Sequence, residues 1–157
     1  MGDSAGGGLA LGYAMKISRE EVKQPTQIIL FSPWLDVSMS NPDVAKYADR
    51  DPILHVNSLK IAGKQYAGEL DTAHYWVSPI YGDFSRIGKV ALFAGTHEVM
   101  VADARKLSRM LAEQHIGCNY YEYPGLFHDW VLAPWLKETQ QAIQQVVDLV
   151  GSSMAKG

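Results

Sequence analysis

Three short runs of apolar and aromatic residues divide the chain into segments. They cover residues 27–31, 89–94 and 119–123, and prolines, glycines or polar residues bound them. Short apolar runs with such boundaries are typical of strands that are buried on both faces of a parallel sheet. The pattern therefore predicts three buried strands.

Apolar residues elsewhere recur at helical spacing, as Leu9, Tyr13 and Ile17 illustrate. Side chains that are three or four positions apart share one face of a helix. The same spacing predicts three helices, over residues 5–22, 101–115 and 135–150. Gly117 follows the second of these, and we expect it to end that helix.

Residues 38–80 lack this regularity. Three Pro-containing pairs, Asn41-Pro42, Asp51-Pro52 and Ser78-Pro79, interrupt the segment, and only residues 58–70 are expected to be helical. We interpret the segment as loops and helices outside the sheet. Strands that alternate with helices around such an excursion predict the α/β fold class, with parallel strands flanked by helices.

Composition and charge narrow the function classes. The 157 residues are 47% hydrophobic and 20% charged, with a net charge of -3 and no basic stripe, so we expect neither nucleic acid nor a membrane as a partner. No apolar run is long enough to cross a bilayer, and no signal peptide is evident. Cys118 is the single cysteine, which excludes an internal disulfide and favours a cytoplasmic location.

A Gly-x-Ser-x-Gly pattern occupies Gly2, Ser4 and Gly6. This pattern is typical of a nucleophile elbow, in which the serine lies on a strained turn between a strand and a helix. We expect glycine at both ends because side chains there would clash within the tight turn. The N–H of Ala5, at the start of the predicted helix, is the expected oxyanion donor. No strand is expected before the pattern, so either the chain is a fragment or the pattern is accidental.

Partners for a serine nucleophile follow in the order that this chemistry requires. Glu98 comes after the second predicted strand and His128 after the third, and both therefore belong to the sheet edge where sites form. Ser4 is the expected nucleophile, His128 its base and Glu98 the acid that orients the imidazole. Asp103 and Asp129 remain rivals for the acid, although we expect both to be surface or structural carboxylates.

The sequence Gly-Asp-Ser-Ala-Gly-Gly, which starts at Gly2, resembles the elbow of the hormone-sensitive-lipase-like esterases. Similar segments of that family match Ser32–Asp36, Tyr75–Tyr81, the acid loop from Gly95 and the histidine loop from Gly125, so the resemblance covers nearly the whole chain. It implies that residues 1–157 are a partial α/β-hydrolase domain, with residues 38–80 contributing to a cap. Two departures are the glutamate at position 98, where the family usually has aspartate, and the missing upstream His-Gly-Gly-Gly segment, which would supply further oxyanion donors.

The resemblance implies a serine carboxylesterase that hydrolyses short- to medium-chain esters without a cofactor or a metal. Trp34 and Phe127 are candidates for substrate binding. Three alternatives stay open: an inactive remnant that lacks the oxyanion segment, an amidase or peptidase of the same fold, and assembly into a homo-oligomer through the edge strand 27–31.

Overall fold

The computed structural model describes residues 1–20 and 22–154. Four parallel strands form one sheet in the order β1-β2-β3-β4. The strands are β1 (Gly2–Asp3), β2 (Gln27–Phe31), β3 (Lys89–Gly95) and β4 (Cys118–Tyr123). The predicted α/β class and the three predicted strands are therefore confirmed, each strand to within one residue at either end.

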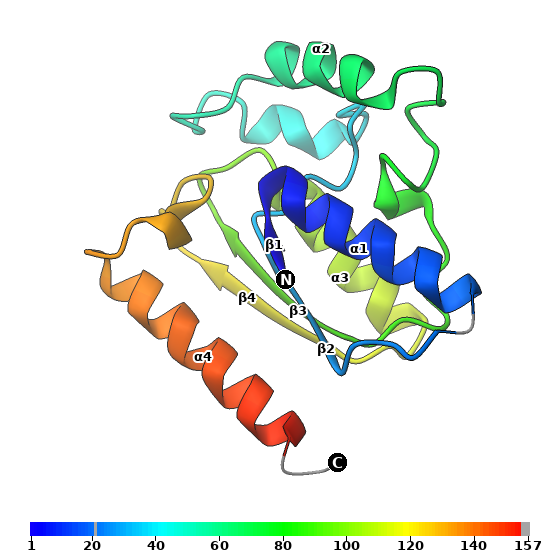
Figure 1. The fold of residues 1–157 in the computed structure, drawn as a ribbon. Coiled ribbons are helices and arrows are strands. Elements are labelled where there is room, and N and C mark those ends of the chain that lie inside the picture. The colour runs from blue at the N-terminus through cyan, green and yellow to red at the C-terminus, as the bar shows by residue number, and fades with distance from the viewer. Residues whose placement is uncertain (21, 155–157) are drawn as a thin grey trace.

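Three long helices cover the two faces of the sheet (Figure 1). Helices α1 (Ser4–Arg19) and α3 (Val101–Glu113) lie on one face, and α4 (Lys137–Met154) lies on the other. All three were predicted, with ends that differ by up to four residues. The predicted role of Gly117 is wrong: the residue that takes a left-handed conformation after α3 is His115, at φ 56°.

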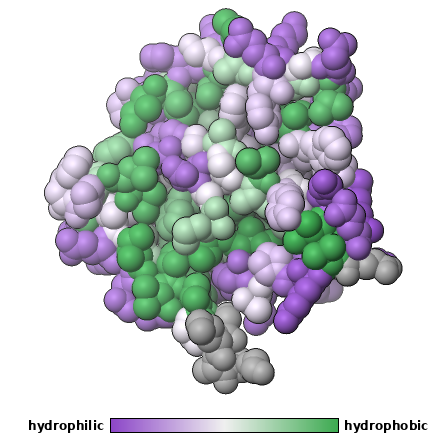
Figure 2. Space-filling model, viewed as in Figure 1, coloured by the Kyte–Doolittle hydropathy of each residue, from purple (hydrophilic) through white to green (hydrophobic). Residues whose placement is uncertain are grey.

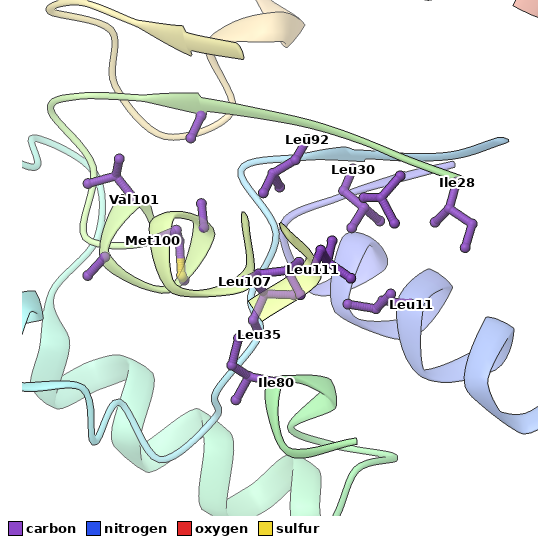
Figure 3. Close-up of a cluster of buried hydrophobic side chains, with 14 of the residues drawn as sticks. Leu11, Ile28, Leu30, Leu35, Ile80, Leu92, Met100, Val101, Leu107 and Leu111 are labelled. Atoms are coloured by element: carbon purple, nitrogen blue, oxygen red, sulfur yellow. The ribbon is translucent and has the colours of Figure 1, made fainter. Parts of the chain in front are cut away.

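The larger core lies between the sheet and the α1/α3 layer. Leu11 of α1 and Leu107 of α3 are fully buried against the strand residue Leu92 and its neighbours (Figure 3). Burying an aliphatic side chain of this size contributes about 1.5–3 kcal/mol to the free energy of unfolding. A second core, which includes Phe93 and Trp130, fills the space between the sheet and α4. Buried side chains thus pack against both faces of the sheet.

A two-residue strand precedes the serine, where none was expected. Gly2 pairs with Leu30 and Asp3 with Phe31, which makes β1 parallel to β2. The pairing was not predictable from hydrophobic pattern because two residues, one of them glycine, carry no periodicity. Ser4 therefore does follow a strand, as a nucleophile elbow requires.

Residues 38–80 form an excursion beside the sheet, as expected. It contains the 3-10 helices η1 (Pro42–Lys46) and η2 (Pro79–Tyr81) and the helix α2 (Val56–Ala67). The last of these matches the helix expected over residues 58–70, and Gly68 ends it at φ 58°. In Figure 1, α2 lies on the far side of η1 from the sheet, above the start of α1.

Candidate active site

Ser4 lies at the turn between β1 and α1. Its φ of 47° is in the left-handed region, which costs a non-glycine residue roughly 1–2 kcal/mol and persists only where the surroundings enforce it. Gly2 is one enforcing feature, because a Cβ there would lie 2.2 Å from the carbonyl oxygen of Gly6. The N–H of Trp34 is another, since it donates to the carbonyl of Ser4 at 2.8 Å. The expected strained turn is therefore present.

Packing requires glycine at some positions of this segment and not at others. A Cβ on Gly7 would lie 2.8 Å from Cβ of Pro33, so Gly7 permits the close approach that was expected. A Cβ on Gly6 would lie 3.7 Å from Asp3 Oδ1, which is an ordinary contact. The expectation that Gly6 avoids a clash is therefore wrong.

His128 follows β4 in the loop that leads to η3 (Trp130–Leu132). Its ring is 4% exposed. Nε2 lies 2.8 Å from Ser4 Oγ, and Nδ1 lies 3.0 Å from Glu98 Oε2. Both distances are within hydrogen-bond range. With Nδ1 donating to the carboxylate, Nε2 is left to accept the hydroxyl proton of Ser4, which is the arrangement of a serine nucleophile with its base.

Glu98 is completely buried in the loop after β3. Its Oε1 accepts the N–H of Gly95 at 2.8 Å, which leaves Oε2 for the imidazole. Burial raises the pKa of Glu98, while hydrogen bonds with His128, Ser32 and Gly95 oppose that rise. The glutamate at this position thus reaches the ring despite its extra methylene.

Neither rival acid lies at Nδ1 of His128. Asp103 is buried in α3 and accepts a hydrogen bond from Asn41 Nδ2 at 2.8 Å. Glu98, and not Asp103, is therefore the carboxylate at His128 Nδ1. Asp129 does reach the ring, but at the other nitrogen, with Oδ2 3.2 Å from Nε2. The expectation that Asp129 is a surface or structural carboxylate missed this contact.

The charges around the imidazole favour its protonated form. Burial lowers the pKa of His128, but hydrogen bonds and charge from Asp129 and Glu98 outweigh that effect and raise it to about 9. Two carboxylates therefore act on one ring, one at each nitrogen.

Two residues that the sequence did not single out support the acid loop. Asp51 Oδ2 accepts the N–H of Val99, the residue after Glu98, at 2.9 Å, and Oδ1 accepts two N–H groups of its own turn. Ser32 is buried at the end of β2 and hydrogen-bonds Glu98. The Asp51-Pro52 pair was visible as a turn signal, but nothing local indicated its distant partner.

The remaining candidates are close to the site without a demonstrated role. Ala5 is exposed in the first turn of α1, where N–H groups have no acceptor within the helix. The indole of Trp34 donates to the carbonyl of Asp36 at 3.1 Å and packs against the core. Phe127 is half-buried and packs against the core on the α4 side. Substrate binding by Trp34 and Phe127 stays a prediction.

Residues 1–20 and 22–154 contain no candidate metal cluster and no candidate membrane span. Within them, no group of three or more His, Cys, Asp or Glu side chains could hold a metal ion. None of the helices in the same residues is long and apolar enough to span a membrane.

The model of the alpha/beta hydrolase fold family matches residues 1–132. The chain belongs to the alpha/beta hydrolase fold family. An acetyl-hydrolase of Streptomyces hygroscopicus is 28% identical over 144 residues, which are 91% of this chain and 48% of that protein. An esterase of Acinetobacter venetianus is 22% identical over 96% of this chain and 50% of its own length.

Solved structures agree with this assignment. An esterase/lipase from an uncultured bacterium superposes with a TM-score of 0.91 at 26% identity, over 98% of this chain and 52% of that one. An esterase from the bacterial hormone-sensitive lipase family has the same fold, with a TM-score of 0.92 at 24% identity, over 97% of this chain and 52% of its own. The resemblance to hormone-sensitive-lipase-like esterases is confirmed at the level of the fold. This alpha/beta hydrolase chain spans about half the length of the relatives it matches.

Proposed function

We propose that the chain carries the nucleophile, base and acid of a serine carboxylesterase that acts on short- to medium-chain esters. The observation that supports this most directly is the unbroken line of hydrogen bonds from Ser4 Oγ through His128 to Glu98. One relative is named an esterase, which favours ester substrates over amides.

The chemistry follows from the atoms in that line. Ser4 Oγ forms a bond to the ester carbonyl carbon while its proton moves to His128 Nε2. The tetrahedral intermediate collapses, the ester C–O bond breaks, and the imidazolium returns the proton to the leaving alcohol. Water, deprotonated by His128, then releases the acid from Ser4. Glu98 stabilises the imidazolium in both halves of the reaction.

The oxyanion of the intermediate needs donors. Ala5 N–H, at the start of α1, is positioned to be one, and the helix dipole adds to its effect. The family segment that would add further donors is not in this sequence. Losing one donor typically costs about 10²–10³-fold in rate, so we expect the 157-residue chain to be slow by itself.

Hydrolysis of p-nitrophenyl acetate and butyrate, with Ser4→Ala as the control, tests the proposal. We expect slow turnover that Ser4→Ala lowers by about 10⁴-fold or to background. An equal rate for both proteins would contradict the proposal. No turnover by either protein would favour the inactive remnant, and a preference for the matching anilides would favour an amidase.

A further inference from the structure

The Nε2 atom of His128 has two neighbours. Ser4 Oγ lies 2.8 Å away and Asp129 Oδ2 lies 3.2 Å away. A neutral imidazole that donates from Nδ1 has only a lone pair at Nε2, and this lone pair can accept the proton of Ser4. A carboxylate is an acceptor only. While Nδ1 donates to Glu98, Asp129 can therefore bond Nε2 only when the ring is an imidazolium. The two neighbours therefore favour different protonation states.

One oxygen of the Asp129 carboxylate has no hydrogen-bond partner among the described residues. This atom, Oδ1, is buried. A buried carboxylate oxygen without donors makes a nearby positive charge more favourable, because no other group offsets its desolvation. The imidazolium of His128 is such a charge.

The backbone holds Asp129 in this place. Its φ of 55° and ψ of 30° are left-handed, a conformation that Asp and Asn tolerate better than most residues. Its N–H points at Ser32 Oγ at 3.4 Å, and its carbonyl accepts the N–H of Leu132 at 2.9 Å as η3 begins. The backbone of the loop therefore places Asp129 beside His128.

We propose that Asp129 is a positioning residue that holds the Nε2 proton of the His128 imidazolium and competes with Ser4 for that nitrogen. The site then rests in a protonated, inactive arrangement, and it becomes active when the ring loses this proton. This proposal rests on the proposed function. It adds that Asp129 sets the pH range in which the site is active.

The other groups around the ring do not reverse this preference. Ser4 on α1 and Ser32 at the end of β2 are uncharged, and the acid loop contributes the carboxylate of Glu98. Within the described residues, the charges that act on His128 are thus both negative. Its pKa of about 9 is consistent with a ring that is mostly protonated at neutral pH.

The contact has two opposite effects on turnover. When Ser4 attacks, its proton arrives at Nε2, where Asp129 stabilises the imidazolium. The same contact delays transfer of that proton to the leaving alcohol. We therefore expect Asp129 to affect kcat and its pH dependence more than KM.

Titration of the His128 ring by ¹H–¹⁵N NMR tests the proposal in the wild-type chain and in Asp129→Asn. Asparagine has the same shape, accepts the left-handed backbone and lacks the charge. The His128 signals are identified by their loss in His128→Gln. We expect the midpoint to fall by about 1–3 pH units in Asp129→Asn and to stay unchanged in the buried-acid control Asp103→Asn. An unchanged midpoint in Asp129→Asn would overturn the proposal.

The pH–rate profile for an ester substrate supplies the second readout. The rising limb of log kcat/KM, which reports the free enzyme, should move to lower pH in Asp129→Asn by the same amount as the NMR midpoint, so the variant should be faster at pH 7. If the NMR midpoint shifts while the rising limb of the rate profile does not move, the proposed competition between Asp129 and Ser4 for Nε2 is overturned. If neither protein hydrolyses esters, the proposed function fails. The NMR titration still decides whether Asp129 holds the Nε2 proton of His128. Asp129→Gly, which also accepts a left-handed backbone, serves if Asp129→Asn does not fold.

Discussion

At the scale of single residues, the contacts of the histidine define the site. Nδ1 faces a buried carboxylate, and Nε2 faces the serine and a second carboxylate. The roles of Ser4, Glu98 and His128 could be predicted because each follows a strand, and parallel strands bring their carboxyl ends to one edge. The contacts of Asp129 and Asp51 could not be predicted from the sequence. The first depends on a left-handed φ, and the second joins residues 48 positions apart in the chain.

Glu98→Gln should nearly abolish turnover. The amide cannot stabilise the imidazolium, and it favours the wrong tautomer of His128, which lowers kcat by about 10⁴-fold in comparable triads. Steady-state ester hydrolysis measures the effect, and Asp103→Asn is the matched control because it changes the rival acid on the neighbouring helix. Full activity in Glu98→Gln together with a large loss in Asp103→Asn would reverse the assignment.

Asp103 should make stability depend on pH. Burial raises its pKa to about 6, against 3.8 in the unfolded chain, while Asn41 and Lys106 lower it and Asp36 raises it further. The folded state therefore binds the proton more tightly, and stability from this group is complete below about pH 4 and falls as the pH rises to about 6.

Urea unfolding of the wild type and Asp103→Asn at several pH values measures this effect. Relative to the wild type, Asp103→Asn should gain roughly 3 kcal/mol between pH 4 and pH 7, because one pKa unit corresponds to about 1.4 kcal/mol. A difference between the two proteins that stays constant over this range would contradict the prediction.

At the scale of elements, α1 positions the serine because it packs closely against the segment after β2. A Cβ on Gly8 would lie 2.2 Å from the carbonyl oxygen of Trp34, which no side chain can relieve. Apolar runs predicted the three longer strands, and helical spacing predicted the helices. Strand β1 and the end of α3 were missed because pairing of two residues and the left-handed His115 depend on tertiary structure.

Gly8→Ala should destabilise the chain by about 1–3 kcal/mol, as overpacking typically does. Gly6→Ala, on the same helix, would place its Cβ in only an ordinary contact with Asp3. It should be neutral or stabilising by about 0.5–1 kcal/mol, because alanine favours helix more than glycine. Chemical unfolding midpoints measure both. Equal effects of the two substitutions would show that helix propensity, and not the contact with Trp34, decides the outcome.

At the scale of the whole 157-residue chain, one edge of the sheet is only partly paired within the described residues. Within the described residues, β1 pairs with β2 only at Leu30 and Phe31, so the first three residues of β2 have no strand partner on that side. A cavity of about 880 Å³ lies along this edge and α1, and the exposed side chains of Leu9 and Tyr13 flank it. Figure 2 shows hydrophobic side chains gathered on the face that carries β1 and α1. Unpaired edges and apolar patches of this kind promote association.

We therefore predict that the 157-residue chain self-associates in a concentration-dependent way. Leu9→Lys with Tyr13→Lys should shift it towards the monomer, because the charges oppose burial of this face. Ile143→Lys on α4, which replaces an exposed apolar side chain on another face, is the control. Light scattering measures the mass, and a monomeric wild type at all concentrations would contradict the prediction.

Covalent labelling of Ser4 by a p-nitrophenyl alkylphosphonate tests most directly whether these three residues form a working nucleophile. Peptide mass spectrometry should find one phosphonyl group on Ser4, none in Ser4→Ala, and strongly reduced labelling in His128→Gln. The buried Ser32, which is also left-handed at φ 43° but hydrogen-bonds Glu98, should stay unmodified. Equal labelling of the wild type and Ser4→Ala, or no label on Ser4, would contradict the assignment of Ser4 as the nucleophile.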